Sequence, residues 1–282
     1  MKASVDPTAH TYAPPRRGWI EILFYVFCGL VLLFLIAPLF VVIPISFSSA
    51  KYLTFPPEGF SFQWYQTFFG STEWLRAALN SIKVAAMTSV LASLLGIPTA
   101  LALTRHKFRG AEFIYSFLIS PMIIPVIIVA IAVYFHFARL KLIGNLYALA
   151  LGHTVLAIPI VLVTVCASLQ GFDQTLEQAA MSLGANRFKT FLKVTFPLIR
   201  AGVISGALFA FIISFDEVVM ALFLATYRSV TLPKHMWSVI RQEIDPTIAA
   251  VASLLVCTSV FLLLSVAMIT RRAERIRGGT KP

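Results

Sequence analysis

Long apolar runs separated by short polar segments dominate this chain. Six runs are each long enough to cross a bilayer core, which takes about 20 residues of helix. The predicted spans are roughly 22–47, 77–104, 113–137, 146–169, 202–225 and 247–269. We therefore expect an all-α integral membrane protein with six transmembrane helices, in a domain of residues 19–271.

The composition and the cysteines agree with this class. The chain is 59% hydrophobic and 12% charged, with a mean hydropathy of +0.86. The first 21 residues are polar, and the apolar run after them is too long for a secretory signal. The first span should therefore remain in the protein. Cys28, Cys166 and Cys257 lie in apolar runs, and their odd number and wide spacing indicate neither a disulfide framework nor a metal site.

Lysine and arginine are divided unevenly between the two sets of flanks. Of the 23, 15 lie in the set that contains both chain ends and residues 170–200. Cytoplasmic flanks are enriched in these residues, so we expect a cytoplasmic tail at 1–18 and a basic cytoplasmic tail at 272–282. The net charge of +11 follows from this bias and from sparse acids. It does not indicate nucleic-acid binding, because no aromatic-interleaved basic stripe or zinc spacing accompanies it.

A polar segment at about 174–195 separates the fourth and fifth predicted spans. Residues 177–183 favour a helix, and Gly184 gives the backbone freedom to turn. Asn186 can cap a second short helix that ends before Pro197, which suits the first turn of the next span. That second helix carries Phe188 on an apolar side. Two short helices with an exposed apolar face suit a groove on a partner protein, and a helix pair lying on anionic lipid is the alternative.

Asp216 and Glu217 are the only acidic residues within a predicted span. Ionised carboxylates are costly in a hydrocarbon core, so such residues usually face a cavity, a partner or a substrate path. Carboxylates accept charge-assisted hydrogen bonds from ammonium groups, which favours a cation-attracting patch on a translocation path. A structural role, such as pairing with a base of another subunit, is the alternative. Adjacent helical residues point about 100° apart, so one acid should face the path, and we favour Asp216.

The polar segment resembles the cytoplasmic EAA loop of ATP-binding-cassette importer permeases. The residues that match are Gln178-Ala179-Ala180, Gly184-Ala185 and Phe196-Pro197. Two positions depart from the pattern, because Gln178 stands where the family has Glu and Phe196 where it has Leu. A neutral Gln keeps a hydrogen bond but no charge pair. The neighbouring Glu177 would then have to supply the charge at an ATPase contact.

The resemblance covers most of the chain and is greatest to the spermidine/putrescine branch of the type I, binding-protein-dependent importers. Matching stretches are 105–110, 169–173, 214–219, 232–233 and 245–246. The resemblance implies a type I importer permease fold. It implies ATPase coupling by Glu177, Gln178, Ala179, Ala180, Gly184, Ala185, Phe188 and Pro197, and a substrate pathway at Ser214, Phe215, Asp216 and Glu217.

The resemblance also implies partners. These are a homologous second permease, an ATP-binding ATPase dimer, a periplasmic substrate-binding protein and the lipid of a bacterial inner membrane. The chain has no Walker-type sequence, so ATP and Mg²⁺ would bind the partner ATPase, and we expect neither a catalytic residue nor a cofactor in this chain. Putrescine and spermidine are the expected substrates, with γ-aminobutyrate, aminophosphonates and other small amino compounds left open. An ion-coupled secondary transporter is the alternative from another class.

Overall fold

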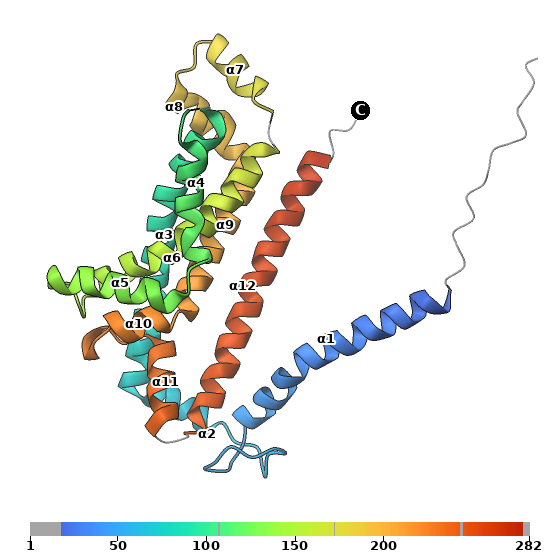
Figure 1. Cartoon of the computed structure of the whole chain (residues 1–282). Coiled ribbons are helices and arrows are strands. Elements are labelled where there is room, and N and C mark those ends of the chain that lie inside the picture. Colours follow the sequence, from blue (N-terminus) through green and yellow to red (C-terminus); the bar gives the residue numbers. More distant parts are fainter. Residues whose placement is uncertain (1–17, 107, 172, 243–244, 279–282) are drawn as a thin grey trace, which may run out of the picture.

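The computed structural model describes residues 18–106, 108–171, 173–242 and 245–278, which are helical almost throughout (Figure 1). Within these residues, five helical stretches are long and apolar enough to cross a membrane, and a bent helix pair makes a sixth when counted as one span. The all-α membrane fold expected from the sequence is confirmed. The long helices are α1 (Trp19–Ser46), α3 (Thr72–Arg105), α6 (Leu146–Gln170), α9 (Phe196–Asp216) and α12 (Thr247–Gly278).

Shorter elements connect the long helices. The helices among them are α2 (Gln63–Gly70), α4 (Ala111–Ile119), α5 (Val126–Arg139), α7 (Thr175–Ser182), α8 (Arg187–Thr190), α10 (Val219–Leu224) and α11 (Leu232–Gln242). Two 3₁₀ turns, η1 (Ser120–Met122) and η3 (Tyr227–Ser229), and one π-helical segment, η2 (Phe191–Thr195), complete the list. Figure 1 shows α7 and α8 at one end of the bundle and α2 and α11 at the other.

The core of the molecule is formed by α3, α6 and α9, which pack against one another along much of their length. Small residues allow this approach. A side chain at Gly96 of α3 would meet Val161 Cγ1 at 2.8 Å, and one at Gly206 of α9 would meet Thr164 Oγ1 at 2.5 Å. Membrane helices gain packing contacts in this way, because small residues let their backbones approach closely.

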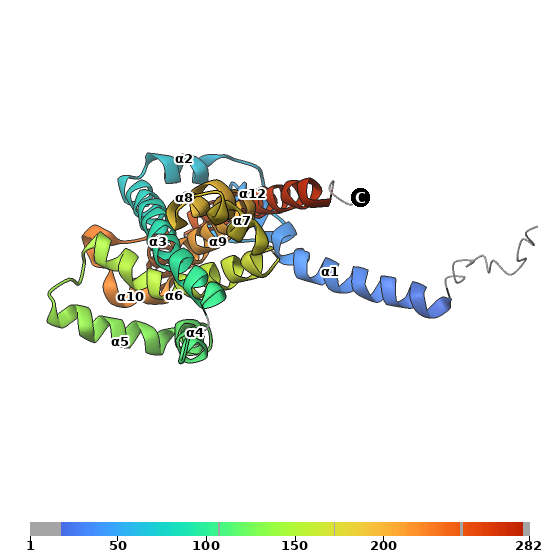
Figure 2. The ribbon, with the colours of Figure 1, turned by 90° about the horizontal axis from the view of Figure 1, so that it is seen from above.

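Helix α1 stands apart from this core. Figures 1 and 2 show it leaning away from the bundle, and its contacts within the chain are chiefly with α12. Its apolar side chains stay exposed in the isolated chain, for example Phe34 at 76%. In a membrane, a surface of this kind faces lipid or a helix of another subunit.

The predicted third span, 113–137, is not one continuous helix. α4 and η1 end at Met122, α5 begins at Val126, and the two parts meet at an angle of 101°. Pro121 and Pro125 lie at this break. Proline lacks an N–H and disfavours a helical conformation in the residue before it, so the apolar run cannot continue as one helix. As a result α5 lies crosswise to the long helices (Figure 1).

The structure gives the predicted fifth span, 202–225, a different first and last residue. A continuous helical stretch runs from Arg187 to Asp216 through α8, η2 and α9, so the helix begins before Pro197 rather than at it. The Phe196 N–H bonds the carbonyl of Phe191 five residues earlier, in a π turn. Such a turn next to Pro197 is expected, since proline offers no N–H to the carbonyl four residues before it. The stretch ends at Asp216, and α10 follows after an interruption.

At the C-terminal end, the observed helix differs from the expected domain bounds. α12 continues to Gly278 and so takes in much of the segment predicted as a basic tail from residue 272. Residues 279–282 of that tail, residues 1–17 of the predicted N-terminal tail, and Lys107 and Phe172 lie outside the described residues.

Candidate functional site

The first candidate site is the loop made by α7 and α8, which turns at Gly184. Gly184 has φ +87°, a left-handed conformation that glycine adopts at little cost. Its N–H donates to the Met181 carbonyl (3.0 Å), and the Ala185 N–H donates to the Ala180 carbonyl (3.1 Å). This pair of bonds is the Schellman arrangement that closes a helix. The turn predicted at Gly184 is therefore confirmed.

Side-chain hydrogen bonds to backbone N–H groups lie at the start of both helices of the loop. Asn186 Oδ1 accepts the Lys189 N–H (2.8 Å), which confirms the cap predicted for the second helix. Asp173 Oδ1 accepts the Thr175 N–H (2.9 Å) at the start of α7. This hydrogen bond lowers the pKa of the exposed Asp173 carboxyl. The loop thus has a fixed shape that its own backbone and caps specify.

Several apolar side chains are exposed on the loop, together with the cations Arg187 and Lys189. Leu183 is 88% exposed, Phe188 69% and Met181 42%. Gln178 and Ala179 are also exposed, whereas Ala180 and Ala185 are partly buried. Pro197 is exposed at the base of the loop. The loop forms the tip of the bundle (Figure 1), so these side chains are available to another protein.

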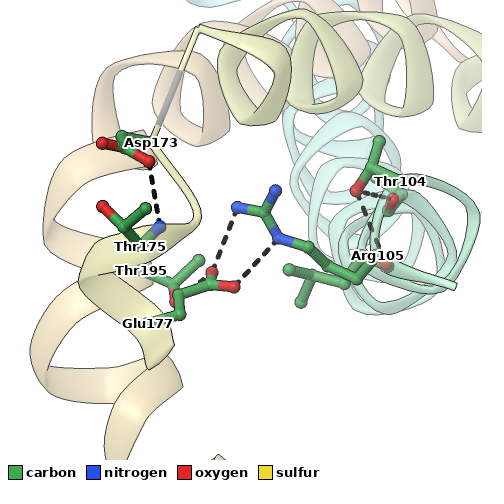
Figure 3. Close-up of polar contacts among 8 residues, drawn as sticks. Thr104, Arg105, Asp173, Thr175, Glu177 and Thr195 are labelled. Carbon is green, nitrogen blue, oxygen red and sulfur yellow. Dashed lines mark hydrogen bonds and ion pairs between the residues drawn. The ribbon is translucent and has the colours of Figure 1, made fainter. Parts of the chain in front are cut away.

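Glu177 does not share this outward orientation. Its carboxylate forms a two-point ion pair with Arg105, the last residue of α3, with Oε2 3.0 Å from Nε and Oε1 3.1 Å from an Nη (Figure 3). The Thr195 hydroxyl donates to the same Oε1 (2.7 Å). The side chains of Arg105 and Glu177 are only 12% and 16% exposed. Glu177 therefore ties α7 to the end of α3 and to η2.

The second candidate site is the interruption between α9 and α10. Asp216 is the last residue of α9 and is exposed in the chain. Glu217 is partly buried, and its Oε1 accepts the Met220 N–H (2.9 Å) at the start of α10. Phe215 stacks on Phe211 with ring centroids 5.7 Å apart. The two acids thus lie at a break in the helix. Glu217 is hydrogen-bonded to the backbone of α10, whereas the Asp216 side chain is exposed.

Ser214, also predicted on the pathway, is buried at 3% exposure. Its Oγ is 2.9 Å from Nδ1 of His153 in α6 and donates to the Thr88 hydroxyl in α3 (3.2 Å). The Thr88 hydroxyl donates in turn to the Ala150 carbonyl (3.2 Å). His153 Nδ1 also lies 3.1 Å from the Ser214 carbonyl, which only accepts, so this nitrogen carries the proton. Ser214 thus joins α9 to α3 and α6 just before the acids.

A comparison with known proteins identifies a family whose model covers both candidate sites. Residues 92–276 match the family model described as binding-protein-dependent transport system inner membrane component. The chain belongs to this family. The matched range includes the loop of α7 and α8 and the break at Asp216, so both candidate sites of this permease lie within the shared region.

Relatives of this permease share most of its length. It is 31% identical to the spermidine/putrescine transport system permease protein PotC of Haemophilus influenzae over 247 residues, which is 87% of this chain and 95% of the relative. It is 31% identical to the putrescine transport system permease protein PotI of Escherichia coli over 229 residues, 79% of this chain and 81% of the relative. These relatives are transport subunits.

A solved structure confirms the fold of the permease. A chain from the crystal structure of a bacterial ABC transporter involved in the import of the acidic polysaccharide alginate superposes with a TM-score of 0.76. The alignment covers 91% of this permease and 98% of that chain, at 16% sequence identity. The importer permease fold expected from the sequence is therefore confirmed.

Sequence reasoning missed several residues that hold the two sites in place. From the sequence, Arg105 counts only as one of the basic residues that flank the predicted spans, but the structure gives it a specific partner in Glu177. Thr195, His153 and Thr88 were not singled out at all. A buried His in an apolar run is a visible signal, whereas nothing local marks Thr88 or Thr195. Within the described residues, no group of three or more His, Cys, Asp and Glu is arranged to hold a metal ion.

Proposed function

We propose that this permease is one of two permease subunits in an ATP-driven importer of small amines, and that its substrates are polyamines such as putrescine and spermidine. The observation that carries the importer assignment is the loop of α7 and α8, which holds Leu183 and Phe188 exposed on a turn of fixed shape. A short amphipathic helix with such a face fits a groove on a partner protein. The partner is the ATPase dimer, which holds the ATP and Mg²⁺.

The loop would dock on the ATPase through its exposed residues. Gln178, Ala179, Gly184 and Phe188 are exposed, Ala180 and Ala185 support the shape behind them, and Pro197 is exposed at the base of the loop. Closure of the ATPase dimer on binding ATP would displace the loop, and the connected helices would reorient to open the pathway toward the other side. Hydrolysis would then restore the inward-facing state. Glu177 contributes to coupling by holding α7 in place.

The remaining partners follow from the family and from the charge bias. A homologous second permease would cover apolar surface that this chain leaves exposed, such as that of α1. The excess of Lys and Arg supports a cytoplasmic position for both chain ends and for the loop. The opposite end of the bundle, with α2 and α11, would then receive substrate from a periplasmic binding protein.

Asp216 supports the assignment of a cationic substrate. It is an exposed carboxylate at a helix break, beside the partly buried Glu217. A carboxylate in this position can accept hydrogen bonds from an ammonium group with charge assistance. Phe215 flanks the acids, and Ser214 anchors them to α3 and α6. The names of the relatives PotC and PotI point to the same substrates.

Reconstitution tests both parts of this proposal. The permease would be placed in proteoliposomes with the second permease, the ATPase and the binding protein, and uptake of labelled putrescine would be followed. We expect uptake that requires ATP and the ATPase and is competed by spermidine. Uptake driven by an ion gradient without the ATPase would contradict the importer. ATP-driven uptake of γ-aminobutyrate or an aminophosphonate that polyamines do not compete would contradict the substrate.

A further inference from the structure

Helix α7 has few packing contacts with the core helices. α7 packs chiefly against α8 and η2, whose chain continues into α9. Between α7 and the end of α3 lies a hollow of about 500 Å³, lined among others by Leu101, Met181 and Phe191. Side chains therefore do not fill the space between α7 and α3, and packing alone does not hold the two helices together.

One polar cluster crosses this hollow, and its residues also line it. Arg105 is the last residue of α3, Glu177 lies in the first turn of α7, and Thr195 ends η2. Two guanidinium nitrogens contact the two carboxylate oxygens at 3.0 and 3.1 Å, and the Thr195 hydroxyl donates at 2.7 Å. Figure 3 shows Glu177 between the other two side chains. We call this cluster the Arg105–Glu177–Thr195 strut.

The geometry of the strut suits a fixed connection. The Nη contact is a hydrogen bond and the Nε contact is an ion-pair distance, and two contacts between an Arg and a carboxylate restrict their relative orientation more than a single one does. Its two side chains are 12% and 16% exposed, so water and salt screen the pair less than they screen a surface ion pair. Thr195 is buried at 2% exposure, which fixes the third point of the strut.

The strut ends on two of the three core helices. Arg105 belongs to α3, and Thr195 leads directly into α9, which ends at Asp216. η2 is π-helical, and such segments are often sites of adjustment in a helix. A displacement of α7 would therefore shift α3 through the ion pair. It would shift α9 through the hydrogen bond to Thr195 and through the adjustable backbone of η2.

We propose that the Arg105–Glu177–Thr195 strut transmits the movement of α7 to α3 and α9, and that Glu177 is a positioning residue rather than a contact to the ATPase. This inference rests on the proposed function as an ATP-driven importer. The negative charge of Glu177 then serves the ion pair with Arg105 within the chain. Glu177 is then not part of the surface offered to the ATPase, which includes Gln178, exposed apolar side chains and the exposed cations Arg187 and Lys189.

The test measures coupling in the complete importer, as substrate imported per ATP hydrolysed in proteoliposomes. The variants are Arg105→Gln, Glu177→Gln and the exchange Arg105→Glu with Glu177→Arg. Arg109→Gln serves as the matched control, because Arg109 is an exposed cation in the connection that follows α3. Co-purification of the ATPase with each variant reports whether the docking surface is intact.

We expect both single variants to lower the coupling ratio about tenfold, since a charge-assisted hydrogen bond is worth roughly one tenfold step in an equilibrium. ATPase co-purification should stay at the wild-type level, the exchange should restore most of the ratio, and the control should match wild type. A wild-type ratio in both single variants would overturn the strut. Loss of ATPase binding in Glu177→Gln alone, without rescue by the exchange, would overturn it too, because Glu177 would then contact the ATPase.

A second pair of variants covers the case in which the charge variants fail to assemble. Thr195→Val removes the hydroxyl at nearly the same volume, and Thr195→Ser retains it. We expect a lowered ratio in the first and a ratio near wild type in the second, and equal ratios in the two would overturn the role of Thr195. Wild-type complex that imports nothing with ATP would instead contradict the proposed function, so the two failures are distinguishable.

Discussion

Replacing Gly184 by Val should uncouple the permease by opposing the turn between α7 and α8. A Cβ at this position would meet no atom within 4 Å, so collision contributes nothing to the effect. The cost comes from φ +87°, because a residue with a Cβ loses about 1–2 kcal/mol in the left-handed region, and a β-branched residue is disfavoured further. This cost reduces the population of the turned loop roughly 5- to 30-fold.

The matched control is Gly184→Asn, which adds a side chain of similar size that adopts the left-handed conformation more readily. ATPase co-purification and ATP-driven uptake would be measured for both variants at equal permease content. We expect both quantities to fall in Gly184→Val and to be largely retained in Gly184→Asn. Equal losses in the two variants would show that bulk at the docking surface, rather than the turn, is responsible. Wild-type values in Gly184→Val would refute the reasoning altogether.

Three further predictions concern the rest of the chain. Asp216→Asn should lower uptake at limiting putrescine more than Glu217→Gln does, because Asp216 is open while Glu217 caps α10; the reverse order of initial rates would contradict this. Ser214→Ala should lower the thermal midpoint in detergent, since unmet buried partners cost about 1–3 kcal/mol; an unchanged midpoint would contradict it. Burial lowers the pKa of His235, a shift that Glu73 opposes. The neutral form is therefore favoured on folding, so stability should fall as the pH falls below the ordinary histidine pKa of about 6.5, and the packing of His235 against Trp74 (ring centroids 4.4 Å) should change once the pH reaches the lowered pKa. Trp74 fluorescence should report this change, and a His235→Gln variant should show none.

The elements that follow from local chemistry were predictable from the sequence. The apolar runs account for the long helices, because a membrane helix is specified by length and hydrophobicity within one segment. Gly184 and Asn186 likewise act through their own backbone or the next few residues, and the structure has the turn and the cap where they were expected. These features need no knowledge of which segments meet in space.

The interruptions of the helices within two apolar runs were not predicted from the sequence. Pro121 and Pro125 lie in a run whose hydropathy does not change across them, and proline is tolerated in many membrane helices, including at Pro98 in α3 and Pro159 in α6. Whether a proline bends or ends a helix depends on the neighbours that satisfy the freed carbonyl groups. The interruption after Asp216 has no proline at all. It coincides instead with a carboxylate that caps the following helix.

The pair of Arg105 and Glu177 could not be predicted, since 72 positions separate its members. From the sequence, Gln178 is a lost charge, and Glu177 is expected to supply that charge at the ATPase. Adjacent helical residues point about 100° apart, however, and Gln178 is exposed where Glu177 is partly buried, although both line the hollow beside α3. The outer face of α7 is then neutral and largely apolar. Salt should therefore weaken the contact between this face of α7 and the ATPase only slightly, because salt screens charges and does not screen apolar contacts.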